Sequence, residues 1–396
     1  MRKLYLFHFL VSLVGAAFWS CWAATFAIHG ETLENMALIV AGIYIAQAIF
    51  EIPTGFTADI YGRKRVSIVG FALMGVGFLL VGLVPSVLGA FVGFFVAGFG
   101  LTLMSGAVNA WLFGLARDLD EGGLVGQGAS QNYFMNTNLV ARLATIAGAY
   151  GGIQILEYYP ESFWKIFGVI TLVFAAYGVL LERSTTDRSS PEERAEFRFA
   201  SLLEYVKQPV LFLTVLSIVL FGLETGIRSL VAQPYVLKIG SGELIYLAYM
   251  QVVFALLRMA GILLFKKLSF FRSANNQRLA MVASLLIFGL AEILNSQIRD
   301  FWVFISIYGV AVMTLGWHFP LRDDFINSII PEKLRATLLS VDASAYNFAS
   351  AFVLILLSQR IGDEQLFSLW IFGGMAAIAS GLVLLSATRF RASSSL

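Results

Sequence analysis

Long apolar stretches alternate with short polar segments along this chain of 396 residues. A helix needs about 20 apolar residues to cross the hydrocarbon core of a membrane, and twelve stretches are long enough. They lie at residues 4–28, 35–56, 65–84, 86–116, 128–156, 162–182, 209–237, 243–265, 279–297, 301–322, 334–360 and 366–388. The pattern predicts an all-α membrane protein with twelve transmembrane helices.

The longest polar segment follows the sixth apolar stretch and carries charges of both signs. It divides the chain into a six-helix bundle at 1–183, a cytosolic interdomain linker at 184–208 and a second six-helix bundle at 209–396. Residues 192–206 fit an amphipathic helix at the membrane surface and equally a solvated linker. The division into two halves of six helices suggests a duplicated architecture.

Composition also favours a lipid environment and argues against several other classes of protein. Hydrophobic residues make up 58% of the chain and charged residues 13%, against roughly 25% charged residues in soluble domains. The single cysteine, Cys21, allows no internal disulfide and no cluster of thiol metal ligands. The sequence contains no nucleotide-binding loop or catalytic motif, and its net charge of +2 does not indicate nucleic acid as a partner. We therefore expect no enzyme activity, catalytic residue, cofactor or bound metal.

Positive charge is distributed unevenly between the predicted loops. Nineteen of the 27 Lys and Arg residues fall in the terminal tails and in the even-numbered loops. Basic loops stay on the cytosolic side of a membrane. The distribution predicts a multi-pass protein of the plasma membrane, or of the cytoplasmic membrane in a bacterium, with both termini in the cytosol.

The loop between the second and third stretches contains the sequence EIPTGFTADIYGRKR, residues 51–65. Gly62 can adopt the positive φ of a tight turn, and the short loop places Asp59 and Arg63 at the cytosolic rim. There the carboxylate can meet a helix N-terminus, and the guanidinium can form ion pairs. A basic anchor that only sets orientation is the simpler interpretation of the same residues.

The spacing of five residues in this loop resembles the signature of the major facilitator superfamily. These residues are Gly55, Asp59, Gly62, Arg63 and Arg65. Residues 105–118 and 329–340 also resemble this family, in particular a bacterial efflux-like branch. The resemblance implies two six-helix bundles around a central cavity, with the five residues acting as a conformational latch. The resemblance implies carboxylates at the positions of Asn109 and Gly114. If either of them pairs with the latch arginine in relatives, Asp118 would have to substitute for it here.

Residues 144–152 resemble a degenerate antiporter motif, with three glycines but no proline: Gly148, Gly151 and Gly152. Close packing of helices through small residues explains the same glycines without any role in transport. The motif therefore gives only weak support for export.

Seven ionisable residues lie inside the predicted spans: Glu51, Arg142, Glu224, Arg228, Arg258, Glu292 and Asp342. Each would cost about 2.5–3.5 kcal/mol at the centre of the bilayer, so the set would cost on the order of 20 kcal/mol if it faced lipid. These residues must form pairs, face water or lose their charge.

Arg142 lies near the middle of its span without an acidic neighbour on the same helix, so we expect it to contact substrate or to take part in coupling. An interhelical salt bridge is the alternative. Glu224 and Arg228 are four residues apart and can neutralise each other. Glu292 is expected near the outer end of its span, where it reaches water.

The remaining candidates for substrate binding or coupling are Asn132, Asn136, Arg258, Asp342 and Glu51. The two asparagines belong to a polar cluster in the fifth span, although such residues also form packing hydrogen bonds between helices. Glu51 and Asp342 lie toward the cytosolic end, which favours structural pairing. Arg258 can pair with either of two acidic residues.

Taken with the resemblance, these features predict an alternating-access secondary transporter. We expect a monomer in membrane lipid that exports a small organic solute by antiport with H⁺. Two alternatives stay open: uptake of an organic anion by symport, and a transporter-like sensor or lipid flippase.

Overall fold

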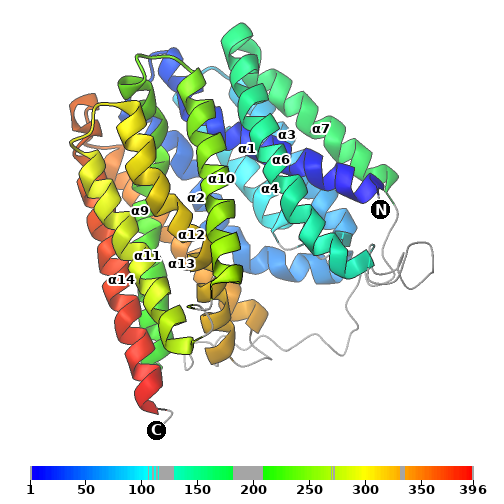
Figure 1. Ribbon diagram of the computed structural model, residues 1–396. Helices are drawn as coiled ribbons and strands as arrows, with labels where there is room; N and C mark the ends of the chain where they lie inside the picture. The colour runs from blue at the N-terminus through cyan, green and yellow to red at the C-terminus, as the bar shows by residue number, and fades with distance from the viewer. Residues whose placement is uncertain are drawn as a thin grey trace. The chain divides into compact units, whose positions relative to one another are not determined.

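The apolar stretches form helices in the computed structural model, which describes residues 2–105, 107–108, 111–112, 115, 129–181, 208–268, 270, 273–330 and 335–394. No strand occurs among these residues. The helices follow the predicted spans closely (Figure 1). The clearest differences are at α2, α12 and α14, which continue beyond the predicted ends at 56, 322 and 388, and at α4, which ends at Met104 inside the predicted span 86–116.

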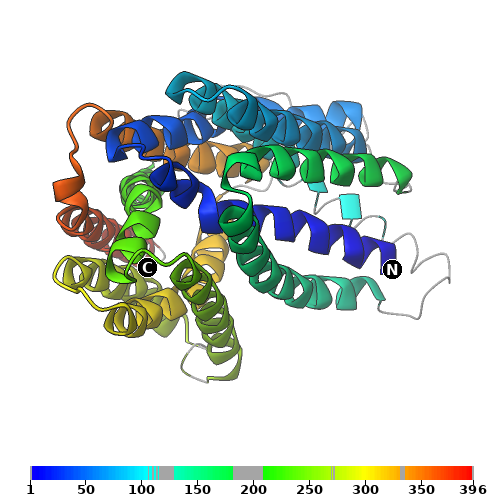
Figure 2. The ribbon, with the colours of Figure 1, turned by 90° about the horizontal axis from the view of Figure 1, so that it is seen from above.

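The helices of the first half form one compact unit, here unit 1. They are α1 (Arg2–Ile28), α2 (Leu33–Tyr61), α3 (Arg63–Leu83), α4 (Val87–Met104), α6 (Ala129–Tyr158) and α7 (Phe163–Leu180), with a 3₁₀ turn at Pro160–Ser162. Helix α3 packs against α4 and α7, and α1 packs between α6 and α7 (Figure 2). Aromatic rings fill the interior of unit 1: Phe18 stacks on Phe78, and Trp164 contacts Phe18, Phe78 and Phe94.

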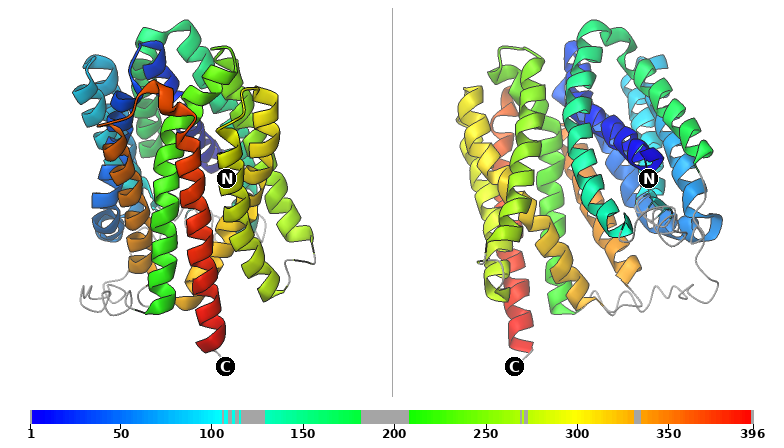
Figure 3. Two further views of the ribbon diagram at one scale, coloured as in Figure 1. Left: turned by 90° about the vertical axis from the view of Figure 1, so that its left-hand side faces the viewer. Right: turned by 45° about the vertical axis from the view of Figure 1, so that its right-hand side comes forward.

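The helices of the second half form unit 2. They are α9 (Pro209–Ile239), α10 (Ile245–Lys267), α11 (Ala274–Asn295), α12 (Phe301–Ile329), α13 (Arg335–Leu357) and α14 (Leu369–Ser394), with a 3₁₀ turn at Asp363–Leu366. Helix α9 packs against α13 and α14, and α14 also packs against α11 (Figure 3). Small polar residues join these helices, because Ser217 and Ser380 bond across α9 and α14, and Ser350 of α13 donates to the Gly222 carbonyl.

Eleven helices among the described residues are long and apolar enough to cross a membrane. Helix α6 is not one of these eleven. The count of twelve crossings therefore stays a prediction. The proposed linker at 184–208 lies almost wholly outside the described residues, so its bounds stay predictions as well.

The junction of α2 and α3 is tighter than a loop. Helix α2 runs to Tyr61 and α3 starts at Arg63, so Gly62 alone makes the turn. Its φ of 92° confirms the predicted left-handed conformation, which favours glycine. Lys64 points back into unit 1, where its ammonium donates to the carbonyls of Val179 and Leu181 at the end of α7. A cation there complements the helix dipole.

Candidate functional site

Two carboxylates and a guanidinium meet inside unit 2. Glu224 on α9 is fully buried, and its Oε1 accepts a hydrogen bond of 2.5 Å from Nε of Arg228, one turn further along the same helix. This contact confirms the predicted pair. Glu292 on α11 is also fully buried and lies within electrostatic reach of both residues. We call Glu224, Arg228 and Glu292 the charge cluster.

Hydroxyl groups and rings surround the charge cluster. Thr225 donates to Oε2 of Glu224, and Tyr308 of α12 donates to Oε1 of Glu292 at 3.3 Å. The Arg228 guanidinium lies 5.8 Å from the centre of the Phe288 ring, within cation–π range. Tyr346 of α13 also faces Arg228 and Glu224. Four helices, α9, α11, α12 and α13, thus enclose these charges.

The prediction that Glu292 reaches water directly is wrong. The residue does lie near the end of α11, as expected, but its exposed fraction is 0%. Helix α11 turns this face toward α12 and α14, because both pack along it. A sequence position near a helix end says how deep a residue lies in the membrane, but not which way it points.

The other intramembrane charges of unit 2 have local partners. Both carboxylate oxygens of Asp342 accept from the Arg322 guanidinium, at 2.7 and 2.8 Å, which confirms structural pairing for Asp342. The Arg258 guanidinium lies 5.6 Å from the centre of the Phe319 ring and faces Tyr346. His318 is 1% exposed, and its Nδ1 bonds to the Met281 carbonyl.

In unit 1, Glu51 accepts a hydrogen bond of 2.9 Å from the Ser105 hydroxyl. Arg142 on α6 is half-buried, and within the described part of the chain it forms no hydrogen bond or ion pair. The interhelical salt bridge considered for Arg142 is therefore not seen among the described side chains. Its role with substrate stays a prediction.

Several predicted site residues fall wholly or partly outside the described part of the chain. These are Gly55, Asp118 and the side chains of Asp59, Asn132 and Asn136. Gly62 makes the turn, Arg63 begins α3, and Arg65 is exposed on the same helix. The latch assigned to these residues stays a prediction, and so does the contribution of Asp118.

The glycines of residues 144–152 pack α6 against α1. A Cβ at Gly148 would lie 2.5 Å from the Leu13 carbonyl oxygen, and one at Gly152 would lie 3.1 Å from Sγ of Cys21. A Cβ at Gly151 would meet nothing within 4 Å. Close helix packing thus accounts for two of the three glycines.

The Gly148→Ala variant should lower stability, because the added methyl group would overlap backbone that cannot move away. Overpacking of this kind costs about 1–3 kcal/mol. Gly151→Ala is the matched control, since it adds the same methyl group to the same helix in open space. Unfolding of both variants in detergent checks the expectation, and equal midpoints would contradict the packing interpretation.

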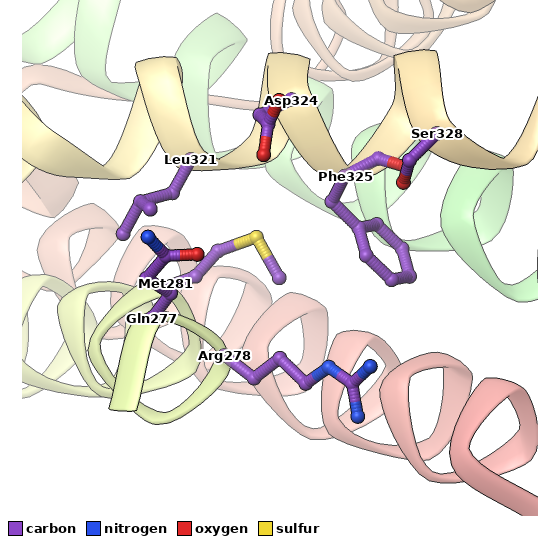
Figure 4. A pocket seen from close by; sticks show the side chains of 7 residues that line it. All are labelled: Gln277, Arg278, Met281, Leu321, Asp324, Phe325 and Ser328. Carbon is purple, nitrogen blue, oxygen red and sulfur yellow. The ribbon is translucent and has the colours of Figure 1, made fainter. Parts of the chain in front are cut away.

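Two cavities lie apart from the charge cluster. One of about 220 Å³ opens between α11 and α12, where Arg278, Met281 and Asp324 are among its lining residues (Figure 4). Met281 precedes Glu292 by eleven residues, or about 16 Å along the helix. The other cavity, of about 350 Å³, lies in unit 1 and is lined in part by His29 and Trp164. Neither cavity includes a residue of the charge cluster.

Apolar helices that enclose buried, partly paired charges are typical of membrane transporters, in which such charges mark ion or substrate pathways. The family comparison agrees with this class. The chain belongs to the Major Facilitator Superfamily, whose model matches residues 4–354. This result confirms the family suggested by the loop motif, and with it a multi-pass membrane protein with a transporter fold.

Solved structures of other transporters share this fold. A variant of the nucleoside transporter NupG has a TM-score of 0.76 at 11% identity, over 98% of this chain and 99% of that chain. An auto-inhibited peptide transporter of the POT family has a TM-score of 0.75 at 12% identity, over 98% and 97%. Comparison with curated proteins gives no match. Identities this low support the fold alone.

Proposed function

We propose that the chain is a secondary transporter that couples movement of H⁺ to movement of a small organic solute, and that the charge cluster binds the proton. The observation that carries this proposal is the charge balance inside unit 2. Two fully buried carboxylates face one guanidinium, so the cluster is neutral only after it gains one positive charge. A net charge buried in a membrane protein is costly, and uptake of a proton removes it.

Geometry favours a proton over a larger cation. Oε1 of Glu292 accepts from Tyr308, whereas Oε2 forms no hydrogen bond within the described part of the chain. Glu224 lies close enough to interact with Glu292. A proton on either carboxylate would supply the hydrogen-bond donor that the contact between Glu224 and Glu292 lacks. Binding and release of that proton would change the attraction between α9 and α11, which is the kind of two-state bias that alternating access needs.

The solute is proposed to carry an anionic group that Arg142 contacts, since this half-buried cation has no hydrogen-bonding or ionic partner among the described side chains. Export by antiport remains our proposal for direction, although the glycines that favoured it also serve packing. Uptake by symport with H⁺ is the alternative. The titles of the similar structures name nucleosides and peptides for those proteins, so both belong in a first panel of solutes.

Flux into proteoliposomes under an imposed pH gradient tests the proposal. The panel consists of labelled nucleosides, dipeptides, organic anions and lipophilic cations. Antiport should concentrate a transported solute on the acidic side, and symport should concentrate it on the alkaline side. Flux of a panel member that proceeds equally with and without the gradient would refute proton coupling.

A further inference from the structure

Polar atoms that lack a hydrogen-bond partner in the described part of the chain occur at and near Glu292. They are Nδ2 and Oδ1 of Asn295, Nε1 of Trp370 and Oε2 of Glu292, none of which forms a hydrogen bond within the described residues. The three side chains are 0%, 1% and 0% exposed, in that order. Buried polar groups in native proteins are almost always paired, with water where protein offers no partner.

The three side chains lie on facing helices. Asn295 follows Glu292 by one turn of α11, and Trp370 precedes Gly373 by one turn of α14. Helices α11 and α14 pack together, and a Cβ at Gly373 would lie 2.9 Å from Oε2 of Glu292. The two helices therefore place Asn295 and Trp370 one turn beyond the Glu292 carboxylate.

Two tyrosines hold this arrangement. The Tyr235 hydroxyl donates to the Asn295 carbonyl at 2.9 Å, and its ring lies 5.3 Å from that of Trp370. The Tyr308 ring lies 5.5 Å from that of Trp370, and its hydroxyl bonds to Glu292. The same indole thus contacts both tyrosines, which connects the surroundings of Asn295 to those of Glu292.

The chemistry of the atoms without partners favours water over a metal cation. Asn295 presents both a donor and an acceptor, and the Trp370 indole presents a donor only. A cation would be repelled by these N–H groups, whereas a water molecule can accept from them and donate to carboxylate and amide oxygens. Buried water typically makes about three such hydrogen bonds.

Asn295 lies close to the surface of unit 2. Gln297, Arg299 and Asp300, which follow α11, are exposed. Arg299 donates to the carbonyls of Ser296 and Ile298 and so satisfies part of the helix end. One residue, Ser296, separates Asn295 from Gln297, the first exposed polar residue. On the predicted orientation, this end faces away from the cytosol.

We infer that Asn295 and Trp370 bind water inside unit 2. This water carries protons between Glu292 and the exposed residues that join α11 to α12. The inference rests on the proposed role of the charge cluster. In each step an O–H bond of one water breaks as the next acceptor gains the proton, and the last acceptor is Oε2 of Glu292. The titratable and charged groups around this route are Glu224 and Arg228 on α9, Tyr235 and Lys238 further along α9, Arg258 on α10, Tyr308 on α12, Tyr346 on α13, and Arg299 and Asp300 after α11.

Hydrogen–deuterium exchange at the Glu292 carboxyl tests the route without a known solute. Infrared difference spectra of the protein in lipid vesicles, recorded after a jump in pH and in H₂O or D₂O, report protonation of this group, and Glu292→Gln assigns its band. Asn295→Leu should slow the exchange about a hundredfold or more, as expected when the water that transfers the proton is no longer held in place. Asn295→Ser should exchange nearly as fast as the wild type, because a hydroxyl still binds water.

Asn327→Leu is the matched control. Its Oδ1 is also buried without a partner among the described residues, but it lies 19 residues after Tyr308 on α12, or about 28 Å away. Trp370→Phe removes only the indole N–H and gives a second, milder test if Asn295→Leu does not fold. Unchanged exchange in both Asn295→Leu and Trp370→Phe would overturn the route while leaving the proposed function intact. Absence of any Glu292 band would count against the proposed function itself.

Discussion

Glu292→Gln is expected to reduce proton-driven accumulation of solute to the level of empty vesicles. Glutamine has nearly the size of glutamate and can still accept from Tyr308, but it cannot bind and release a proton. The charge cluster then contains one carboxylate and one guanidinium and is neutral without a proton. The imposed pH gradient therefore loses its influence on the equilibrium between the two states of the transporter.

Exchange of labelled for unlabelled solute separates this effect from a failure to fold. Exchange needs solute binding and alternation but no net proton movement, so the variant should retain it. Glu243→Gln, in the exposed turn after α9, is the matched control and should accumulate solute like the wild type. Accumulation at the wild-type ratio in Glu292→Gln would exclude this residue from coupling.

Hydropathy alone was enough to locate the helices, because an apolar stretch of about 20 residues has few alternatives to a membrane span. The ends were less predictable. Helix α2 continues to Tyr61 since a single glycine, Gly62, suffices for the reversal. Helix α12 contains Pro320 and continues past it to Ile329, whereas the apolar pattern alone ends the span at 322.

The charge cluster was only half visible from sequence. Glu224 and Arg228 share a helix face because of their spacing of four residues, so their pairing could be predicted. Glu292 comes from a helix 68 residues away, and its neighbour Tyr308 from another. Periodicity does not say which face of α11 meets α9, and an isolated glutamate near a helix end was therefore assigned to water. The apolar residues around Glu292 were the one available signal that its side chain is buried and not exposed to water.

Packing also decided the meaning of the glycines. In sequence, Gly148, Gly151 and Gly152 form one motif, and either transport or packing explains it. In the structure, two of them lie against α1 and the third does not. The sequence could not show that two of these glycines serve packing, because the helix that they contact, α1, is separated from α6 by about a hundred residues of chain.

Arg228→Ala should be the most destabilising single change at the charge cluster. Glu224 is fully buried and accepts its Arg228 hydrogen bond at 2.5 Å, so removal of the guanidinium leaves a buried carboxylate without its counterion. Because the Arg228 side chain is 31% exposed, the loss should be smaller than the about 3–5 kcal/mol expected when a fully buried pair is broken. Unfolding of the purified protein in mixed micelles measures the loss, and transport should disappear with it.

The double variant Glu224→Gln with Arg228→Ala distinguishes a lost counterion from lost packing. Because the neutral amide needs no counterion, the double variant should be more stable than Arg228→Ala alone, and the double-mutant cycle should give a coupling energy of about 0.5–3 kcal/mol. If the two changes were instead additive, Arg228 would stabilise unit 2 through its contact with Phe288 rather than through Glu224. In that case Arg228 would not act as the counterion of the buried carboxylates. Glu292 would then have to bind its proton without help from Arg228.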